Sequence, residues 1–153
     1  GVYNYEMMSV YYIGLNQLDP ALSDLRVRQA LAYALDKQTI VDTVYGETAT
    51  VADDIFPDNH WSHNPDVTKY EYNPEKAKEL LEEAGYTMNA ATGYYEKDGQ
   101  TLHLTYDMST STDGRQVAAL IQQYLKAIGV EMEVSEHDFA TLSYSKLLPN
   151  NAT

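Results

Sequence analysis

The sequence predicts an α/β fold, with helices mainly on one face of a mixed sheet and a βαβ unit near the C-terminal half. Stripes of apolar residues spaced three and four apart alternate with short runs of β-favouring residues. A strand, an amphipathic helix and a second strand follow one another from Leu102 to Val134, which predicts a right-handed parallel crossover. Lys97–Gln100 is a strong hairpin turn signal. Together these patterns indicate an α/β or α+β domain.

Residues 9–46 are expected to form a strand followed by helices. Ser9–Asn16 is rich in β-branched and aromatic residues and apolar on both faces, so we expect an interior strand there. From Leu25 to Tyr45 the apolar repeat is helical. Asp36 is the expected N-cap of a second helix, and Gly46 its stop.

Residues 47–73 show no clear period and are expected to form a long loop. This stretch holds two prolines, the only tryptophan, two histidines and several aspartates. A loop of this length inside a compact domain is usually functional, or wraps another surface.

Residues 74–148 are expected to form a helix, a hairpin and the βαβ unit. Asn73 is the predicted cap of a helix that starts at Pro74 and ends at Gly85. The expected elements that follow are a hairpin over Tyr94–Tyr106, a helix over Val117–Ile128, a strand over Val130–Val134 and a last helix from Asp138 through Leu148.

Composition excludes several classes of function. The 153 residues carry 10 basic and 23 acidic side chains, a formal charge of −13, which disfavours nucleic acid and anionic membranes as partners. There is no cysteine, which excludes disulfides, thiol catalysis and thiolate metal sites within these residues. The chain begins without methionine or a signal peptide, so we expect a processed or excised piece.

Catalytic and metal-binding signals are weak. His60 and His63 lie among aspartates and could hold a divalent metal, which keeps a metal-assisted hydrolase as an alternative. Glu131 and Glu133 share a strand face, and a solvated face is their expected role. No nucleophile-elbow or phosphate-loop motif is present. We therefore expect no catalytic residue, no resident metal and no cofactor.

Aromatic residues are the better ligand candidates. The 14 tyrosines are too many for one site, and we expect Tyr33, Tyr45, Tyr124 and most others to pack at helix–sheet borders. The candidates to contact a ligand lie on or beside the predicted strands and loops: Tyr11, Tyr12, Asn16, Trp61, Tyr106 and Ser109. Ser109 opens a polar loop at the carboxyl end of a strand, the edge at which α/β sheets tend to bind ligands. Thr112 or Asp113 is expected to cap the helix that follows.

The order of short motifs from residue 9 to 142 resembles the family 5 extracellular solute-binding proteins, the peptide, dipeptide and nickel binding components of ABC importers. The motifs that carry the resemblance are Asn16, Leu25–Lys37, Ile40-Val41, Gly46, Ile55–Pro57, Trp61, Asn64–Asp66, Tyr72–Tyr86, Leu102–Tyr106, Ile121-Gln122, Leu125 and Ile128–Val130. The chain departs from the family at Leu18–Leu22, where members often have a double proline and an aromatic residue.

The resemblance implies a lobe of the periplasmic-binding-protein type. Family members close two hinged lobes on a ligand, carry out no chemistry and hand their cargo to a membrane permease. They are extracellular or periplasmic, and often lipid-anchored. Residues 1–153 would be most of the second lobe, with any lipid anchor outside these residues and very weak peptide affinity on their own. A regulatory module that senses ligand with the same fold is the remaining alternative.

Overall fold

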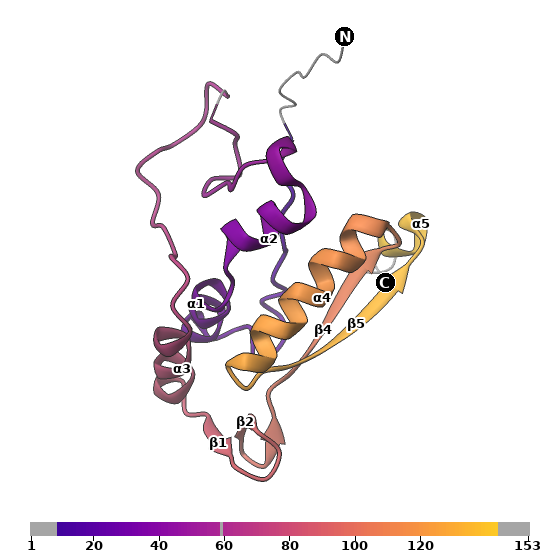
Figure 1. Ribbon diagram of the computed structural model, residues 1–153. Helices are drawn as coiled ribbons and strands as arrows, with labels where there is room; N and C mark the ends of the chain where they lie inside the picture. The colour runs from indigo at the N-terminus through magenta and orange to yellow at the C-terminus, as the bar shows by residue number, and fades with distance from the viewer. Residues whose placement is uncertain (1–8, 59, 144–153) are drawn as a thin grey trace, which may run out of the picture.

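The computed structural model describes residues 9–58 and 60–143 (Figure 1). Its helices are α1 (Leu25–Ala34), α2 (Lys37–Val44), the short 3₁₀ helix η1 (Gly46–Thr48), α3 (Pro74–Glu83), α4 (Thr112–Ala127) and α5 (Phe139–Thr141). Its strands are β1 (Thr87–Asn89), β2 (Tyr94–Lys97), β3 (Gln100–Thr101), β4 (His103–Ser109) and β5 (Glu131–His137). The predicted α/β class is confirmed.

The strands form two sheets rather than one mixed sheet. Strands β4 and β5 are parallel and joined through α4, which confirms the βαβ unit. Strands β1, β2 and β3 form a small antiparallel sheet. The hairpin predicted over Tyr94–Tyr106 is therefore shorter than expected. Leu102 joins the two sheets, because its N–H donates to the carbonyl of Tyr95 in β2 while its own carbonyl accepts from the N–H of Glu131 at the start of β5.

One continuous core joins the helices to the sheets. Helix α1 packs on α3, and α4 covers one face of β4 and β5 (Figure 1). Val27 and Ala30 of α1 meet Ala77 and Leu81 of α3 with no exposed surface, as the helical stripes predicted. Burial of such apolar side chains stabilises a domain by about 25 cal/mol per Å².

The predicted helix caps are mostly confirmed. The side chains of Asp36 and Asn73 accept hydrogen bonds from the backbone N–H groups of Thr39 and Lys76. The prediction of Thr112 or Asp113 as the cap of α4 is wrong by one or two positions, since Ser111 accepts from Gly114 N–H and Thr112 is the first helical residue. Asp138 caps α5, and the part of the predicted last helix from residue 144 onward lies outside the described residues.

The two arginines of α1 donate hydrogen bonds to backbone carbonyls of neighbouring segments. The Arg26 guanidinium donates to the Glu83 carbonyl near the end of α3, and its ion pair lowers the pKa of Asp24 to about 2. Arg28 donates to the carbonyls of Leu22 and Ser23 at 2.8 and 2.9 Å. The motif that carries much of the family resemblance therefore serves helix packing.

The predicted strand over Ser9–Asn16 is wrong for the described residues, which form a coil there. A strand needs a neighbour for its N–H and C=O groups, and the described part of the chain supplies none. Tyr11 and Tyr12 are consequently 84% and 80% exposed, instead of buried in a sheet interior.

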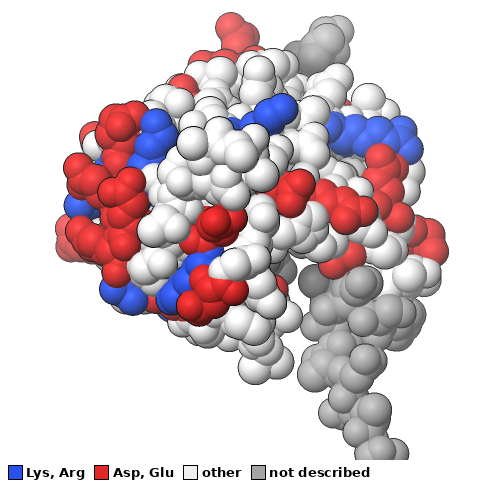
Figure 2. Space-filling model, turned by 90° about the horizontal axis from the view of Figure 1, so that it is seen from below, with Lys and Arg blue, Asp and Glu red and all other residues white. Residues whose placement is uncertain are grey.

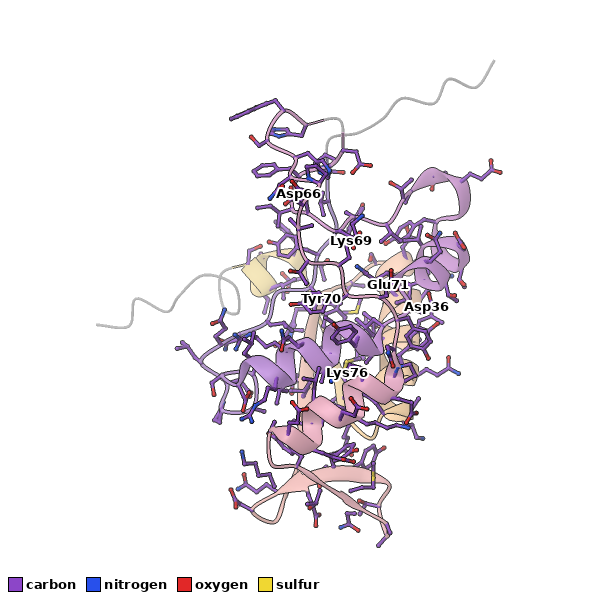
Figure 3. The ribbon with its side chains drawn as sticks, turned by 90° about the vertical axis from the view of Figure 1, so that its left-hand side faces the viewer. Asp36, Asp66, Lys69, Tyr70, Glu71 and Lys76 are labelled. Carbon is purple, nitrogen blue, oxygen red and sulfur yellow. The ribbon has the colours of Figure 1, made fainter. Side chains whose placement is uncertain are left out.

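Among the described residues of the predicted long loop over 47–73, η1 at its start is the only helix or strand. Figure 3 shows Asp66, Lys69, Tyr70 and Glu71 following one another along this loop beside the helices. The C-terminal end of the loop packs on α1. The ring centroids of Tyr70 and Tyr33 lie 5.2 Å apart in an edge contact, and the Asn73 N–H donates to the Tyr33 carbonyl. Two lysines, Lys37 and Lys69, hold Asp53 at 2.6 and 3.6 Å.

The described surface is predominantly acidic. Figure 2, seen from the hairpin end, shows acidic side chains gathered over the side of the molecule that carries α3, whose sequence includes four glutamates. Within residues 9–58 and 60–143, no helix is both long and apolar enough to span a bilayer.

Candidate functional site

Residues Val10 to Tyr12 form a wall with a different surface on each side. Val10 and Tyr12 line an open hollow of about 300 Å³ together with Ile55 from the long loop. Tyr11, between them, stacks instead on Tyr45, with 5.8 Å between the ring centroids. This alternation is the one an extended backbone imposes on successive side chains. The coil therefore presents an apolar hollow on one side and an aromatic stack on the other.

Tyr45 follows α2 directly and is half-buried. Burial raises the pKa of its phenol, and electrostatic interactions with Tyr11, Asp113 and Tyr106 raise it further. Tyr106 lies on β4, and Asp113 lies in the first turn of α4.

The predicted site residues do not all come together. Tyr11 stacks on Tyr45, and burial raises the pKa of Tyr106, which lies on β4. Tyr12 lines the hollow on the other side of the wall. Ser109 is the last residue of β4, half-buried opposite His137 in the register of the parallel pair.

Asn16 and Trp61 stand apart from these groups. The Asn16 side chain accepts from Leu18 N–H at 3.1 Å and so shapes a turn. Trp61 is 91% exposed in the long loop, where its ring lies 5.6 Å from that of His60. His60 in turn stacks on Phe56 at 4.7 Å. Among the described residues, no ring–ring contact joins this second aromatic group to the wall.

His60 and His63 form their contacts within the long loop. His60 Nδ1 accepts from Ser62 N–H at 3.1 Å, and His63 Nδ1 lies 3.0 Å from the Phe56 carbonyl. His63 also lies 3.7 Å from both Asp54 and Asp58. No group of three or more His, Asp or Glu side chains in the described part of the chain is arranged to hold a metal.

The face of β4 and β5 away from α4 is polar, as predicted for Glu131 and Glu133. His103 lies 3.1 Å from Glu131 and 3.8 Å from Glu133, and all three are well exposed. Near the carboxyl end, His137 Nε2 lies 2.6 Å from Asp107 Oδ1 and 3.1 Å from Ser135 Oγ. A nucleophilic triad needs serine and aspartate on opposite ring nitrogens. Because one nitrogen serves both partners here, this arrangement does not activate the serine.

Tyr45 is a member of this candidate site that the sequence did not single out. The sequence assigned it to packing, since it falls at the end of a helical stripe. The signal that could have singled it out is its place beside the helix stop Gly46, where a side chain can extend past the core. Its stacking partner Tyr11 is distant in sequence, and no local sequence pattern predicts such a contact.

The chain matches the family model for bacterial extracellular solute-binding proteins, family 5 Middle, over residues 1–151. It is similar to the oligopeptide-binding protein AppA of Bacillus subtilis, with 34% identity over 148 residues, covering 94% of this chain and 27% of AppA. It is also similar to a dipeptide-binding protein of Escherichia coli, with 31% identity over 132 residues, covering 86% of this chain and 23% of that protein.

Solved structures are similar in the same region. AppA of Bacillus subtilis in complex with a nonapeptide superposes with a TM-score of 0.80 at 32% identity, over 85% of this chain and 26% of that one. NikZ of Campylobacter jejuni in complex with Ni(L-His) gives a TM-score of 0.78 at 34% identity, over 86% of this chain and 27% of that one. The chain thus spans about a quarter of the length of the proteins it matches.

Proposed function

Because the chain belongs to the bacterial extracellular solute-binding proteins of family 5, we propose that residues 1–153 form one lobe of a two-lobe binding protein. The whole protein captures a peptide, or a related small solute, and delivers it to an ABC importer. The proposal is supported by relatives that are named for binding oligopeptides, dipeptides and nickel. Each of them is about four times as long as the stretch matched here, which leaves room for a second lobe.

The observation that carries the proposal is the exposed wall at Val10–Tyr12. An exposed patch of neighbouring apolar side chains often marks an interaction site, whereas a single exposed apolar side chain does not. Here Tyr11 and Tyr12 stand open beside an apolar hollow of about 300 Å³. A second lobe that closed over this wall would bury a ligand against both of its sides. The hollow takes an apolar side chain of the ligand, and Tyr106 and Ser109 line the sheet edge beyond it.

Closure explains how such a lobe gains affinity. A ligand that touches both lobes favours the closed state by the difference in its affinity for the two states. One lobe alone offers part of the contacts and no closed state. We therefore propose that residues 1–153 alone bind peptide very weakly, and that Asn16 and Trp61 contact ligand only if the second lobe brings it to them.

We further propose that the lobe performs no covalent chemistry and works outside the cytoplasmic membrane. The polar groups of the sheet face support the first point, since Ser135 and Asp107 share one nitrogen of His137. Membership of an extracellular family supports the second point. Any lipid anchor lies outside these residues.

The proposal is tested by calorimetry on the longest native chain that contains these residues, and on residues 1–153 alone. The long chain is titrated with peptides of two to nine residues, with sugars and with a nickel–histidine complex. We expect a peptide to bind the long chain at micromolar concentration or below, and no measurable binding to the short one. If the long chain bound none of these solutes, the transport function would be refuted. Micromolar binding by residues 1–153 alone would refute the lobe assignment.

A matched pair of substitutions locates the site. Tyr12→Ala empties one wall of the hollow and is expected to weaken peptide binding about tenfold, a typical loss for a buried aromatic contact. Leu18→Ala removes an apolar side chain that is 91% exposed and outside the hollow, and should leave affinity unchanged. Equal losses in both variants would place the ligand elsewhere.

A further inference from the structure

Three side chains from two distant segments line the hollow beside the wall. Val10 and Tyr12 come from the N-terminal coil, and Ile55 comes from the long loop. Val10 is half-buried, whereas Tyr12 and Ile55 are 80% and 73% exposed. On the coil, Tyr11 stacks on Tyr45 and leaves its two neighbours on the side of the hollow. The shape of the hollow therefore depends on how the loop places Ile55 against the coil.

Asp54 fixes the backbone of the loop at Ile55. Its Oδ1 accepts a hydrogen bond from Ile55 N–H at 2.7 Å, and its Oδ2 accepts one from Asn64 N–H at 2.8 Å. The Asp54 side chain is only 12% exposed. Hydrogen bonds to a charged acceptor are stronger than those between neutral groups, so this one carboxylate closes the loop across ten residues.

The residues on both sides of Asp54 and Ile55 are held as well. Asp53 lies 2.6 Å from the ammonium of Lys37 in α2, which ties the start of this segment to the helices. The carbonyl of Phe56 lies 3.0 Å from His63 Nδ1, within the loop. Ile55 thus stands between anchored neighbours, and its side chain, unlike theirs, lines the hollow.

The hollow suits one side chain of a solute rather than a whole solute. Its volume of about 300 Å³ is at the lower limit for ligand pockets, which usually measure about 300–1,000 Å³. The hydroxyl of Tyr12 is the only polar group among the three lining side chains. A charged or strongly polar group would lose water there without gaining enough hydrogen bonds. The lining therefore favours a single apolar side chain as the occupant.

We propose that Ile55 determines which apolar side chain of a peptide solute the hollow accepts, and that Asp54 positions Ile55 for this role. The proposal rests on the proposed function and names the residue that sets the preference of its site. A side chain of the size of leucine contacts Ile55 from the loop and Val10 and Tyr12 from the coil. A smaller side chain leaves part of this apolar surface in water.

The experiment uses alanine pentapeptides in which one position at a time is replaced by Leu, Phe or Asn. Asn resembles Leu in shape but is polar. Affinities are measured by calorimetry on the longest native chain that contains these residues. At one position, we expect Leu to bind about tenfold more tightly than Ala, and Asn no more tightly than Ala.

Two substitutions of Ile55 test its role in opposite directions. Ile55→Phe fills the hollow and should reduce the Leu-over-Ala ratio to about twofold or less. Ile55→Ala widens the hollow and should shift the preference from Leu toward the larger Phe by about threefold. Leu18→Ala is the matched control, because it also removes three carbon atoms from a strongly exposed side chain, but outside the hollow, and should leave the ratios unchanged.

Substitutions of Asp54 test its positioning role. Asp54→Ala releases both N–H groups and should lower the Leu-over-Ala ratio about threefold, while the affinity for penta-alanine changes little. Asp54→Asn keeps an oxygen that can accept a hydrogen bond and should retain part of the ratio. Asp66→Ala removes an exposed carboxylate elsewhere in the same loop (Figure 3) and should change neither quantity.

The outcomes are distinct. No preference for Leu at any position, or unchanged ratios in both Ile55 variants, overturns this inference while the peptide-binding function stands, because another part of the protein would then fill the hollow. Equal changes in Ile55→Ala and Leu18→Ala also overturn it. An equal loss of affinity for every peptide in Asp54→Ala overturns the positioning role of Asp54. Failure of every peptide to bind overturns the proposed function, and this inference with it.

Discussion

Gly129 is the point at which α4, β5 and the hairpin sheet meet, and the structure predicts that no larger residue fits there. Its φ is +77°, and a Cβ built on it would lie 2.6 Å from Met88 Cε and 3.2 Å from the Gly93 carbonyl oxygen. Its own carbonyl accepts a 2.7 Å hydrogen bond from Tyr95 N–H. Alanine at this position meets both an unfavourable backbone conformation and a steric clash.

Gly93 is a matched control, because its φ is +76° but a Cβ there would meet nothing within 4 Å. A left-handed conformation costs a residue with a Cβ about 1–2 kcal/mol, so Gly93→Ala should lose roughly that amount of stability. Overpacking adds about 1–3 kcal/mol at Gly129 only, which gives a total of about 2–5 kcal/mol for Gly129→Ala.

Urea unfolding of the wild type and both variants, followed by far-UV circular dichroism, measures these losses. We expect Gly129→Ala to be less stable than Gly93→Ala by about 1–3 kcal/mol. Met88→Ala added to Gly129→Ala should recover part of this difference, since the nearest atom is the end of a flexible side chain. Equal losses at the two glycines would refute the close approach at Gly129.

The remaining predictions concern Arg26 of α1, the cap of α4 and the buried phenol of Tyr95. Arg26→Met should lower the urea midpoint but leave solute affinity unchanged. Because the pKa of Asp24 is lowered to about 2, the stability that its ion pair with Arg26 contributes is present above pH 4 and is lost as the pH falls through about 2. A loss of affinity at unchanged stability would place Arg26 in the site. Ser111→Ala should cost about 1 kcal/mol in a denaturation assay, and Thr112→Ala much less, because only Ser111 caps α4; the reverse order would contradict that assignment. Burial and a hydrogen bond to a carboxylate raise the pKa of Tyr95 to about 12, so the stability that its neutral form contributes is present below pH 10 and lost as the pH rises through about 12. Tyr95→Phe should remove this alkaline loss, and an unchanged pH profile would count against it.

Local signals allowed the helices to be predicted well. Apolar residues three and four apart, together with Asp36 and Asn73 as caps, located α1, α2 and α3, because a helix is bonded within its own segment. The cap of α4 was assigned one or two positions too late, to Thr112 or Asp113, because Ser, Thr and Asp are nearly equivalent as caps in sequence. Only the backbone geometry selects one of them.

Contacts distant in sequence could not be predicted in the same way. Ser9–Asn16 has the composition of a strand, but a strand also requires a partner, which the described residues do not supply. Strand β1 was missed because it has only three residues and depends on β2 for its bonds. The stacking of Tyr11 on Tyr45 brings together two segments that carry no shared signal. The candidate residues were therefore chosen by type, and only the fold could group Tyr45 with Tyr11.

The alternation of side chains at Val10–Tyr12 has a consequence for how such a lobe evolves. No ladder of hydrogen bonds fixes this coil among the described residues, so its register depends on where its side chains lodge. Insertion or deletion of one residue between Tyr12 and the turn at Asn16 would shift Val10–Tyr12 by one position and direct a different side chain toward Tyr45. If the wall contacts ligand as we propose, a single such slip would alter solute preference in one step, without any substitution in the helices that support the lobe.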